Sequence, residues 1–121
     1  MKKYLLFLAA NFIAVLSFAQ VVKAEDASKH VGETVMVCGK VFGGKFFETS
    51  TNSPTLLNVG AAWPKSPFTI MIPKEIRIKM GNAPEIELKD KNVCVTGKII
   101  LYKEKPEIII SDAAQLTIEK E

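Results

Sequence analysis

The sequence predicts an all-β fold in which five strands form a small barrel. The first observation is a phrase that occurs twice, as VMVCGKV over residues 35–41 and as VCVTGKI over residues 93–99. β-branched residues at every second position are typical of a strand with one buried face. Each copy also carries a Gly-Lys pair at the same place, and a glycine inside a strand usually marks a bulge or a bend. Two long strands that bend at matched points are what a small closed barrel requires.

Five apolar, β-rich runs follow one another along the chain, and turn-forming residues separate them. Gly43-Gly44 and the polar stretch Thr49–Pro54 separate the first run from the second, and Pro106 opens the last run, where it need not donate to the ladder. The predicted strands cover about Thr34–Phe42, Thr55–Val59, Phe68–Ile72, Asn92–Tyr102 and Glu107–Ile110.

Two segments between or before these runs are predicted to be helical. Residues 73–81 begin with proline and end with glycine, and Ile76 and Met80 share one helical face. Apolar residues also alternate within this segment, so a strand is the alternative. The polar segment 25–30 predicts a shorter helix, and we expect residues 85–88 to be an irregular link.

The element order is therefore strand, strand, strand, helix, strand, strand. This is the order of the OB-fold, a five-stranded, partly open Greek-key barrel. We expect the barrel to occupy residues 33–118, after an N-terminal segment of residues 20–32 that contains the short helix. The first and fourth strands of this fold are neighbours, which would bring Cys38 and Cys94 together.

The sequence contains two cysteines, Cys38 and Cys94, at the same alternation parity in their own strands and opposite to the valines of the repeat. An even pair predicts a disulfide in an oxidising compartment, and two buried reduced thiols are the alternative. A disulfide that closes this loop would stabilise the fold by roughly 4 kcal/mol. Two thiols without a nearby histidine are too few for a zinc site, and there is no Cys-x-x-Cys pair of the redox-enzyme type.

The first residues are typical of a cleavable signal peptide. Lys2 and Lys3 precede an apolar stretch, and residues 17–19 (Ser-Phe-Ala) supply a cleavage site after Ala19, with Ala24 as a second acceptable site. An uncleaved membrane anchor is the alternative, but the apolar run is short for a membrane span. We therefore expect residues 1–19 to be removed and the mature protein to be periplasmic or secreted, without a membrane contact.

Removal of residues 1–19 would leave 102 residues (121 minus 19), which is enough for one domain with one core. It would also remove Lys2 and Lys3, so the formal charge would fall from +3 to +1. A strong nucleic-acid binder usually has a clear basic excess. Attraction to phosphate would therefore depend on a local cluster of lysines.

A set of phrases is found at residues 30–35, 37–41, 57–60, 64–70, 95–99 and 105–110, followed by Asp112 and Gln115. Together these phrases resemble exported bacterial OB-fold domains of the nucleic-acid-binding, tRNA-anticodon-like type. In that group the turn after the last strand often reads Asp-Pro-x-Gln, and here Ala113 stands in place of the proline. The resemblance covers roughly residues 27–118 and implies an OB-fold, while it is weakly specific for the ligand.

OB-folds that bind nucleic acid use the face of strands two and three together with the first and fourth loops. Aromatic rings in such a site stack on unpaired bases, and lysines attract the phosphate backbone. Phe46 and Phe47 are adjacent, so one ring should point outward and the other inward. Packing in the core or at a barrel end is the alternative for the rings, and a solvated surface is the alternative for the lysines. The predicted nucleic-acid-binding residues are Lys45, Phe46, Phe47, Trp63, Lys65, Tyr102, Lys103 and Lys105.

We accordingly predict an exported, monomeric binding module that has no catalytic activity and needs no metal or cofactor. Asp112 has no partner for acid–base chemistry in the sequence pattern and is expected to cap the following turn. Single-stranded DNA or RNA is the leading partner class. The alternative is a periplasmic barrel that binds a protein partner or a small ligand, which the near-neutral charge favours.

Overall fold

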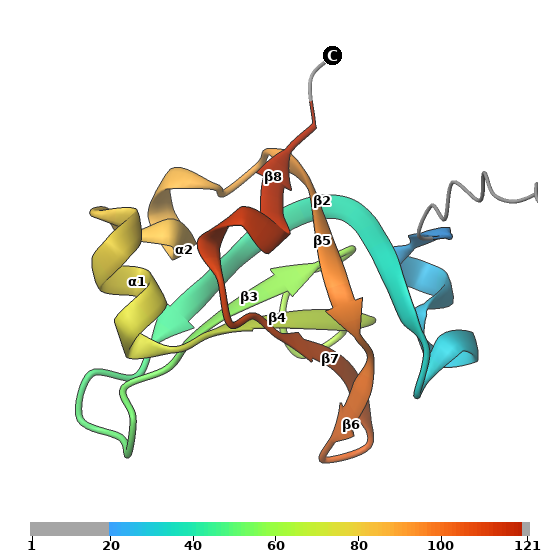
Figure 1. Cartoon of the computed structure of the whole chain (residues 1–121), viewed down its shortest axis with the longest axis horizontal. Coiled ribbons are helices and arrows are strands. Elements are labelled where there is room, and N and C mark those ends of the chain that lie inside the picture. The colour runs from blue at the N-terminus through green and yellow to red at the C-terminus, as the bar shows by residue number, and fades with distance from the viewer. Residues whose placement is uncertain (1–19, 120–121) are drawn as a thin grey trace, which may run out of the picture.

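The computed structural model describes residues 20–119, and the predicted signal peptide of residues 1–19 lies outside this range. Strands are the main regular structure of the described chain (Figure 1). The strands are β1 (Val21–Lys23), β2 (Thr34–Phe46), β3 (Thr55–Val59), β4 (Phe68–Ile72), β5 (Asn92–Lys98), β6 (Ile100–Tyr102), β7 (Lys105–Ile109) and β8 (Leu116–Ile118). The helices are the 3-10 helices η2 (Ala24–His30) and η3 (Ala113–Gln115) and the α-helices α1 (Lys74–Met80) and α2 (Pro84–Glu87).

The all-β prediction is confirmed, but the predicted number of five strands is wrong. The sheet has eight strands. Strands β1 and β8 have three residues each, too few to show an alternating pattern. The run predicted over residues 92–102 is divided at Ile99 into β5 and β6.

The sheet rolls into a barrel because β6 lies at one end of it and β5, its neighbour in sequence, lies next to the other end. The strand order is β6-β7-β4-β3-β2-β5-β8, with β1 paired in parallel to β2. Strand β5 pairs with β2, whereas β6, one residue further along the chain, pairs with β7. Figure 1 shows β2 as a long curved strand that crosses over β3 and β4. This arrangement is that of an OB-like barrel.

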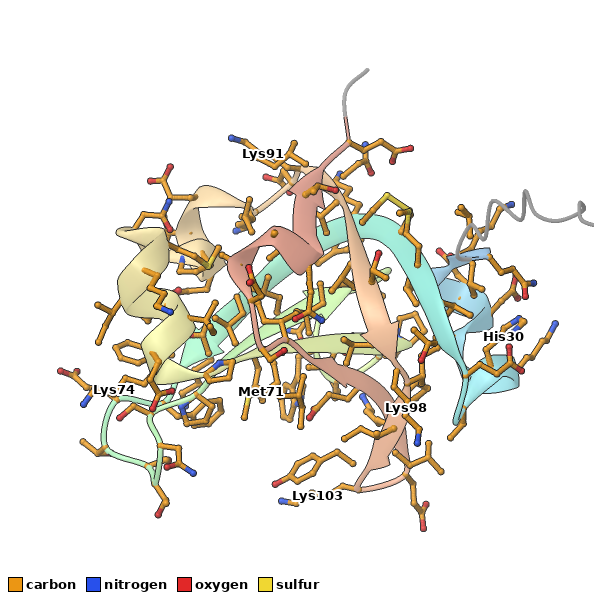
Figure 2. The ribbon with its side chains drawn as sticks, in the orientation of Figure 1. His30, Met71, Lys74, Lys91, Lys98 and Lys103 are labelled. Carbon is orange, nitrogen blue, oxygen red and sulfur yellow. A yellow bond between two sulfur atoms is a disulfide. The ribbon has the colours of Figure 1, made fainter. Side chains whose placement is uncertain are left out.

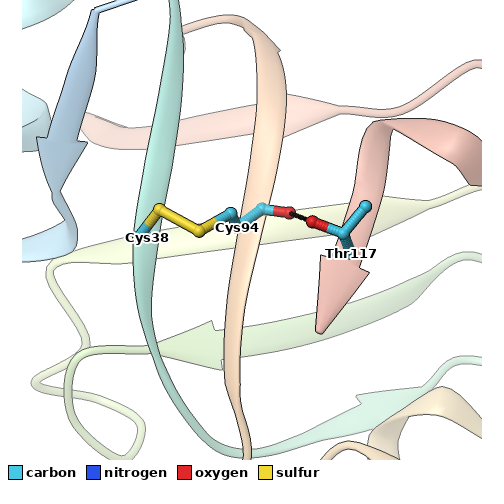
Figure 3. Close-up of a disulfide and its surroundings, with 3 residues drawn as sticks. All are labelled: Cys38, Cys94 and Thr117. Carbon is cyan, nitrogen blue, oxygen red and sulfur yellow. Dashed lines mark hydrogen bonds between the residues drawn. A yellow bond between two sulfur atoms is a disulfide. The ribbon is translucent and has the colours of Figure 1, made fainter. Parts of the chain in front are cut away.

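The predicted pairing of the first and fourth strands is confirmed. Cys38 and Cys94 are direct partners in the antiparallel register of β2 and β5, and they form a disulfide that closes a separation of 56 residues (Figure 3). The neighbouring pair Val37 and Val95 points into the core, where both side chains are buried. The parity argument therefore placed the sulfur atoms on the outer face of the barrel wall.

The two glycines of the repeated phrase form no bulge, which was one of the two roles, a bulge or a bend, that the sequence indicated for them. Gly39 and Gly97 are paired in an unbroken register, and a Cβ at Gly97 would collide with Ile108 on the facing strand. The irregularity lies between Val41 and Gly44 instead. Strand β2 therefore continues through Gly44, where a turn was expected, and a side chain there would strike the backbone of β3.

The predicted helix between the third and fourth strands of the OB-fold is confirmed as α1. Pro73 precedes it in an extended conformation, and Gly81 ends it at φ 72° with its N–H donating to the last turn. Ile76 lies on the buried face of this helix, as the helical spacing of Ile76 and Met80 predicted. Residues 84–87 form helix α2, so the expectation of an irregular link over 85–88 is wrong; Pro84 occupies the first turn, where a proline is tolerated.

Both ends of the barrel are covered. Helices α1 and α2 lie at one end and η2 at the other (Figure 1). Ala24 and Ala27 of η2 are fully buried, and Val22 of β1 is also part of the core. Residues 20–32 therefore pack onto the barrel. No helix in residues 20–119 is long and apolar enough to cross a membrane.

Candidate nucleic-acid interface

One outward face of the sheet is set by the register of four strands. Lys45 on β2 lies opposite Leu56 on β3, Leu56 lies opposite Met71 on β4, and Met71 pairs with Ile109 on β7. The adjacent residues of β3, β4 and β7, such as Leu57, are fully buried in the core. Because side chains alternate along a strand, this row points away from the core.

A second row on the same face is polar. Asn58 on β3 lies opposite Thr69 on β4, and Thr69 pairs with Glu107 on β7. Ile100 on β6 continues this row, and Tyr102 pairs with Lys105 beyond it. The face therefore changes from apolar side chains in one row to hydrogen-bonding side chains in the next.

Loops at the rim turn this face into a groove. Three adjoining hollows have volumes of about 440, 300 and 470 Å³ and share lining residues; Leu56 lines all three. We call their union the groove. Its floor is made of the row residues Leu56, Asn58, Thr69, Met71, Glu107 and Ile109, and its rim is made of Lys45, Phe47, Trp63, Tyr102, Lys103 and Lys105. Figure 2 shows Met71 and Lys103 on the same, lower side of the sheet.

Cations and aromatic rings are paired at the rim. The Nζ atom of Lys45 lies 5.1 Å from the centre of the Phe47 ring, and that of Lys103 lies 5.4 Å from the centre of the Tyr102 ring. Trp63 is 74% exposed beside them. An exposed tryptophan next to a groove is a surface on which a flat, unpaired ring system can stack.

Most of the predicted binding residues therefore meet at one groove. Five of them line it without other bonds between their side chains and the described residues: Lys45, Phe47, Trp63, Tyr102 and Lys103. Lys105 also lines it, but its Nζ donates to the carbonyl oxygens of Pro64 (2.7 Å) and Ser66 (3.4 Å). We assign Lys105 to holding the Trp63 loop in place.

Phe46 and Lys65 are placed elsewhere. Phe46 faces helix α1, and the guanidinium of Arg77 stacks on its ring at 3.7 Å. Arg77 also donates to Glu85 and to Thr55 at 2.7 Å each, so this cluster joins the helices to the barrel. Lys65 is exposed in the loop that carries Trp63 but does not line the groove.

The sequence analysis did not identify six residues of the floor. The alternation of the predicted strands could have shown that their side chains point outward, but only the strand register shows that these positions lie side by side. The residues are Leu56, Asn58, Thr69, Met71, Glu107 and Ile109.

Glu107 is the unusual member of the floor. The residue is only 5% exposed, and its carboxylate makes no hydrogen bond and no ion pair with any part of residues 20–119. Burial raises the pKa of the Glu107 carboxyl above its ordinary value. A buried acid without a partner destabilises the folded state.

Replacement of Glu107 by glutamine is therefore expected to raise the free energy of unfolding at neutral pH, by about 1 kcal/mol or more. The folded state keeps the proton of Glu107 to a higher pH than the unfolded state does. Below about pH 4, the ordinary pKa of glutamate, Glu107 is protonated in both states and the folded protein keeps its full stability. This stability is lost as the pH rises through the pKa of Glu107 in the folded state. The gain from Glu107→Gln should grow from acid to neutral pH in denaturant titrations. Glu104→Gln, on the exposed turn, should change stability by less than about 0.5 kcal/mol, and equal effects would contradict the assignment.

Asp112 has the structural role that the sequence suggested. Its Oδ1 accepts a hydrogen bond from the N–H of Ala114 at 2.8 Å, and the Oε1 of Gln115 accepts one from the N–H of Asp112 at 2.9 Å. Gln115 also donates to the carbonyl of Thr96, which ties η3 to β5.

Over residues 20–119, no three side chains of the His, Cys, Asp and Glu types gather as a metal site.

The fold is shared with solved structures of low sequence identity. The chain is similar to the structure of yeast Stn1 and Ten1 (13% identity, TM-score 0.57, 85% of this chain and 64% of that one) and to a putative aspartyl-tRNA synthetase from Leishmania major (13%, 0.54, 91% and 23%). It is also similar to the OBody AM1L10, solved bound to hen egg-white lysozyme (14%, 0.53, 89% and 100%). It spans less than two thirds of the first two chains. No protein-family model and no curated protein matches it. At these identities the similarities show an OB-like fold.

Proposed function

We propose that this chain is a non-catalytic OB-fold module that binds single-stranded nucleic acid in the groove. The observation that carries the proposal is the exposed ring of Trp63 beside two lysine–aromatic pairs on one rim. Unpaired bases present flat faces for such rings, and the adjacent ammonium groups suit the phosphates. The site also coincides with the face and loops that OB-folds use for oligonucleotides.

The charges of the groove are distributed in a way that suits this ligand. Lys45 and Lys103 lie on the rim, whereas the acid Glu107 lies on the floor. A strand bound with its phosphates along the rim and its bases toward the floor would keep the phosphates near the lysines. This arrangement provides a local attraction that the net charge of the chain does not indicate.

The salt dependence of binding tests the proposal. We expect the log of the association constant for a fluorescent oligothymidine of about 12 nucleotides to fall with log salt, by about 0.7 per phosphate contact. In Lys45→Gln/Lys103→Gln the magnitude of this slope should drop by about 1.4, because two contacts are lost.

Lys89→Gln/Lys91→Gln is the matched control, since it removes the same charge from exposed positions before β5; Figure 2 shows Lys91 on the side of the barrel away from Lys103. This control should keep the slope of the unmodified protein. Absence of binding even at about 25 mM salt, where the phosphate attraction is strongest, would refute the proposal.

Export into an oxidising compartment is part of the proposal, and the disulfide supports it.

The position of the N-terminal strand β1 distinguishes between the two candidate cleavage sites. A cut after Ala19 would leave β1 whole, whereas a cut after Ala24 would remove β1 and the buried Val22 and Ala24. We therefore favour Gln20 as the mature N-terminus. The intact mass of the exported protein tests this, and a mass that begins at Glu25 would contradict it.

A protein partner is the second candidate, because one floor row is apolar. Leu56 and Met71 are half-buried, and Ile109 is 45% exposed beside them. The similar OBody was solved bound to a protein, lysozyme. Ile109→Lys separates the two candidates: the added charge should strengthen binding of single-stranded DNA and weaken an apolar protein contact. Weaker DNA binding in this variant would favour the protein partner.

A further inference from the structure

The floor of the groove carries a group that the fold does not use. Glu107 lies between Thr69 of β4 and Ile100 of β6 in the sheet register, and it lines both hollows that meet at Tyr102 and Lys103. It is 95% buried (5% exposed), yet residues 20–119 offer its carboxylate no hydrogen bond and no ion pair. Buried polar groups in native proteins are nearly always paired. Its missing partner is therefore expected to come from a ligand in the groove.

The lysines nearest to Glu107 along the chain are engaged elsewhere. Lys105 Nζ donates to the carbonyl oxygens of Pro64 and Ser66, and Lys103 Nζ lies over the ring of Tyr102. A single carboxylate is also too few ligands for a cation site, and no group of three potential metal ligands occurs among the described residues. A ligand in the groove would therefore meet this carboxylate with hydrogen-bond donors of its own.

The chemistry of the carboxylate limits which base it can take. An ionised carboxylate has two acceptor oxygens and no donor. The Watson–Crick edge of guanine presents two adjacent donors, N1–H and N2–H₂, which match the two oxygens. On the same edge, adenine, cytosine and thymine each place their donor beside acceptors, which the carboxylate would repel. Unpaired bases are commonly recognised through this edge.

We propose that Glu107 selects guanine in a single strand by accepting hydrogen bonds from N1–H and N2–H₂ of the base. This inference rests on the proposed function and identifies the base that the groove prefers. The flanking residues agree with it: Trp63 and Tyr102 both line the hollow that contains Glu107 and supply rings for stacking. Asn58 lies two strands away in the same row, and its amide can donate to O6 of the base.

The test compares guanine with inosine, which lacks only the N2 amino group. Oligothymidines of about 12 nucleotides carry one central guanine, inosine or adenine, and their affinities are measured by fluorescence anisotropy. We expect the unmodified protein to prefer guanine over both other bases by at least about fivefold. In Glu107→Gln this preference should fall below about twofold, while the salt dependence stays the same, because no phosphate contact is removed.

Glu104→Gln is the control, since it removes one acid from the exposed turn next to the groove and should keep the guanine preference. Binding of all three oligonucleotides with equal affinity, or an unchanged preference in Glu107→Gln, would overturn the inference and leave the proposed function standing. Absence of binding to any oligonucleotide would overturn both.

Discussion

Trp63→Ala/Phe47→Ala is expected to weaken binding of single-stranded DNA by about 30-fold or more. Each ring that stacks on a base contributes about 1–3 kcal/mol, and the two rings lie on the rim of one hollow of the groove. Trp63 is largely exposed in the free protein, so its removal should leave the barrel stable. Anisotropy titrations at low salt measure the loss, and thermal unfolding of the double variant checks that it folds.

Phe42→Ala is the matched control for the aromatic variant. Phe42 is an exposed phenylalanine of β2 and, like Phe47, has a lysine over its ring, since Lys40 Nζ lies 5.3 Å from the ring centre, but it does not line the groove. Its replacement should leave the affinity within about twofold, as expected for a surface substitution without a ligand contact. If Phe42→Ala lost as much affinity as the double variant, binding would not be confined to the groove.

Cys38→Ala/Cys94→Ala is expected to lower the free energy of unfolding by about 4 kcal/mol. The disulfide joins residues 56 apart in sequence, so it removes a large loop-closure entropy from the unfolded chain. For a domain of this size the melting temperature should fall by roughly 15–30 °C. Denaturant titrations of the oxidised protein and of the double variant measure the difference.

Thr117→Val is the control for the disulfide variant. Thr117 Oγ1 reaches the carbonyl of Cys94 only at 3.5 Å, beside the disulfide (Figure 3), so its loss should cost less than about 1 kcal/mol. Reduction of the unmodified protein should reproduce the loss seen in the double variant. A loss below about 1 kcal/mol in both would mean that the disulfide adds little to the stability of this barrel.

The strands and the disulfide could be predicted because their signals are local. The alternation around Cys38 and Cys94 assigns one face of each strand to the core. The repeated phrase places the two cysteines on the same, opposite face of their strands, where they can pair. Helix α1 was predictable for the same reason, since its start and end are marked by proline and glycine. Strands β1 and β8 carry no such signal, because three residues are held in place only by the strands beside them.

The groove shows where local signals end. The sequence indicated that one of the adjacent rings of Phe46 and Phe47 faces outward, but not which one. The continuation of β2 through the bulge before Gly44 decided it: Phe46 pairs with Thr55 and turns toward Arg77, and Phe47 turns to the groove.

Residue order alone was enough to predict an OB-like barrel, its bridging cystine and most of the residues that line the groove, since each depends on patterns a few residues long. The tertiary structure was needed to show that Glu107 is buried without a partner and that Lys105 is occupied by a loop 39 to 41 residues away in sequence. Burial and pairing of a side chain depend on strands that meet only after the sheet has rolled, and the register of that meeting is set by the whole barrel.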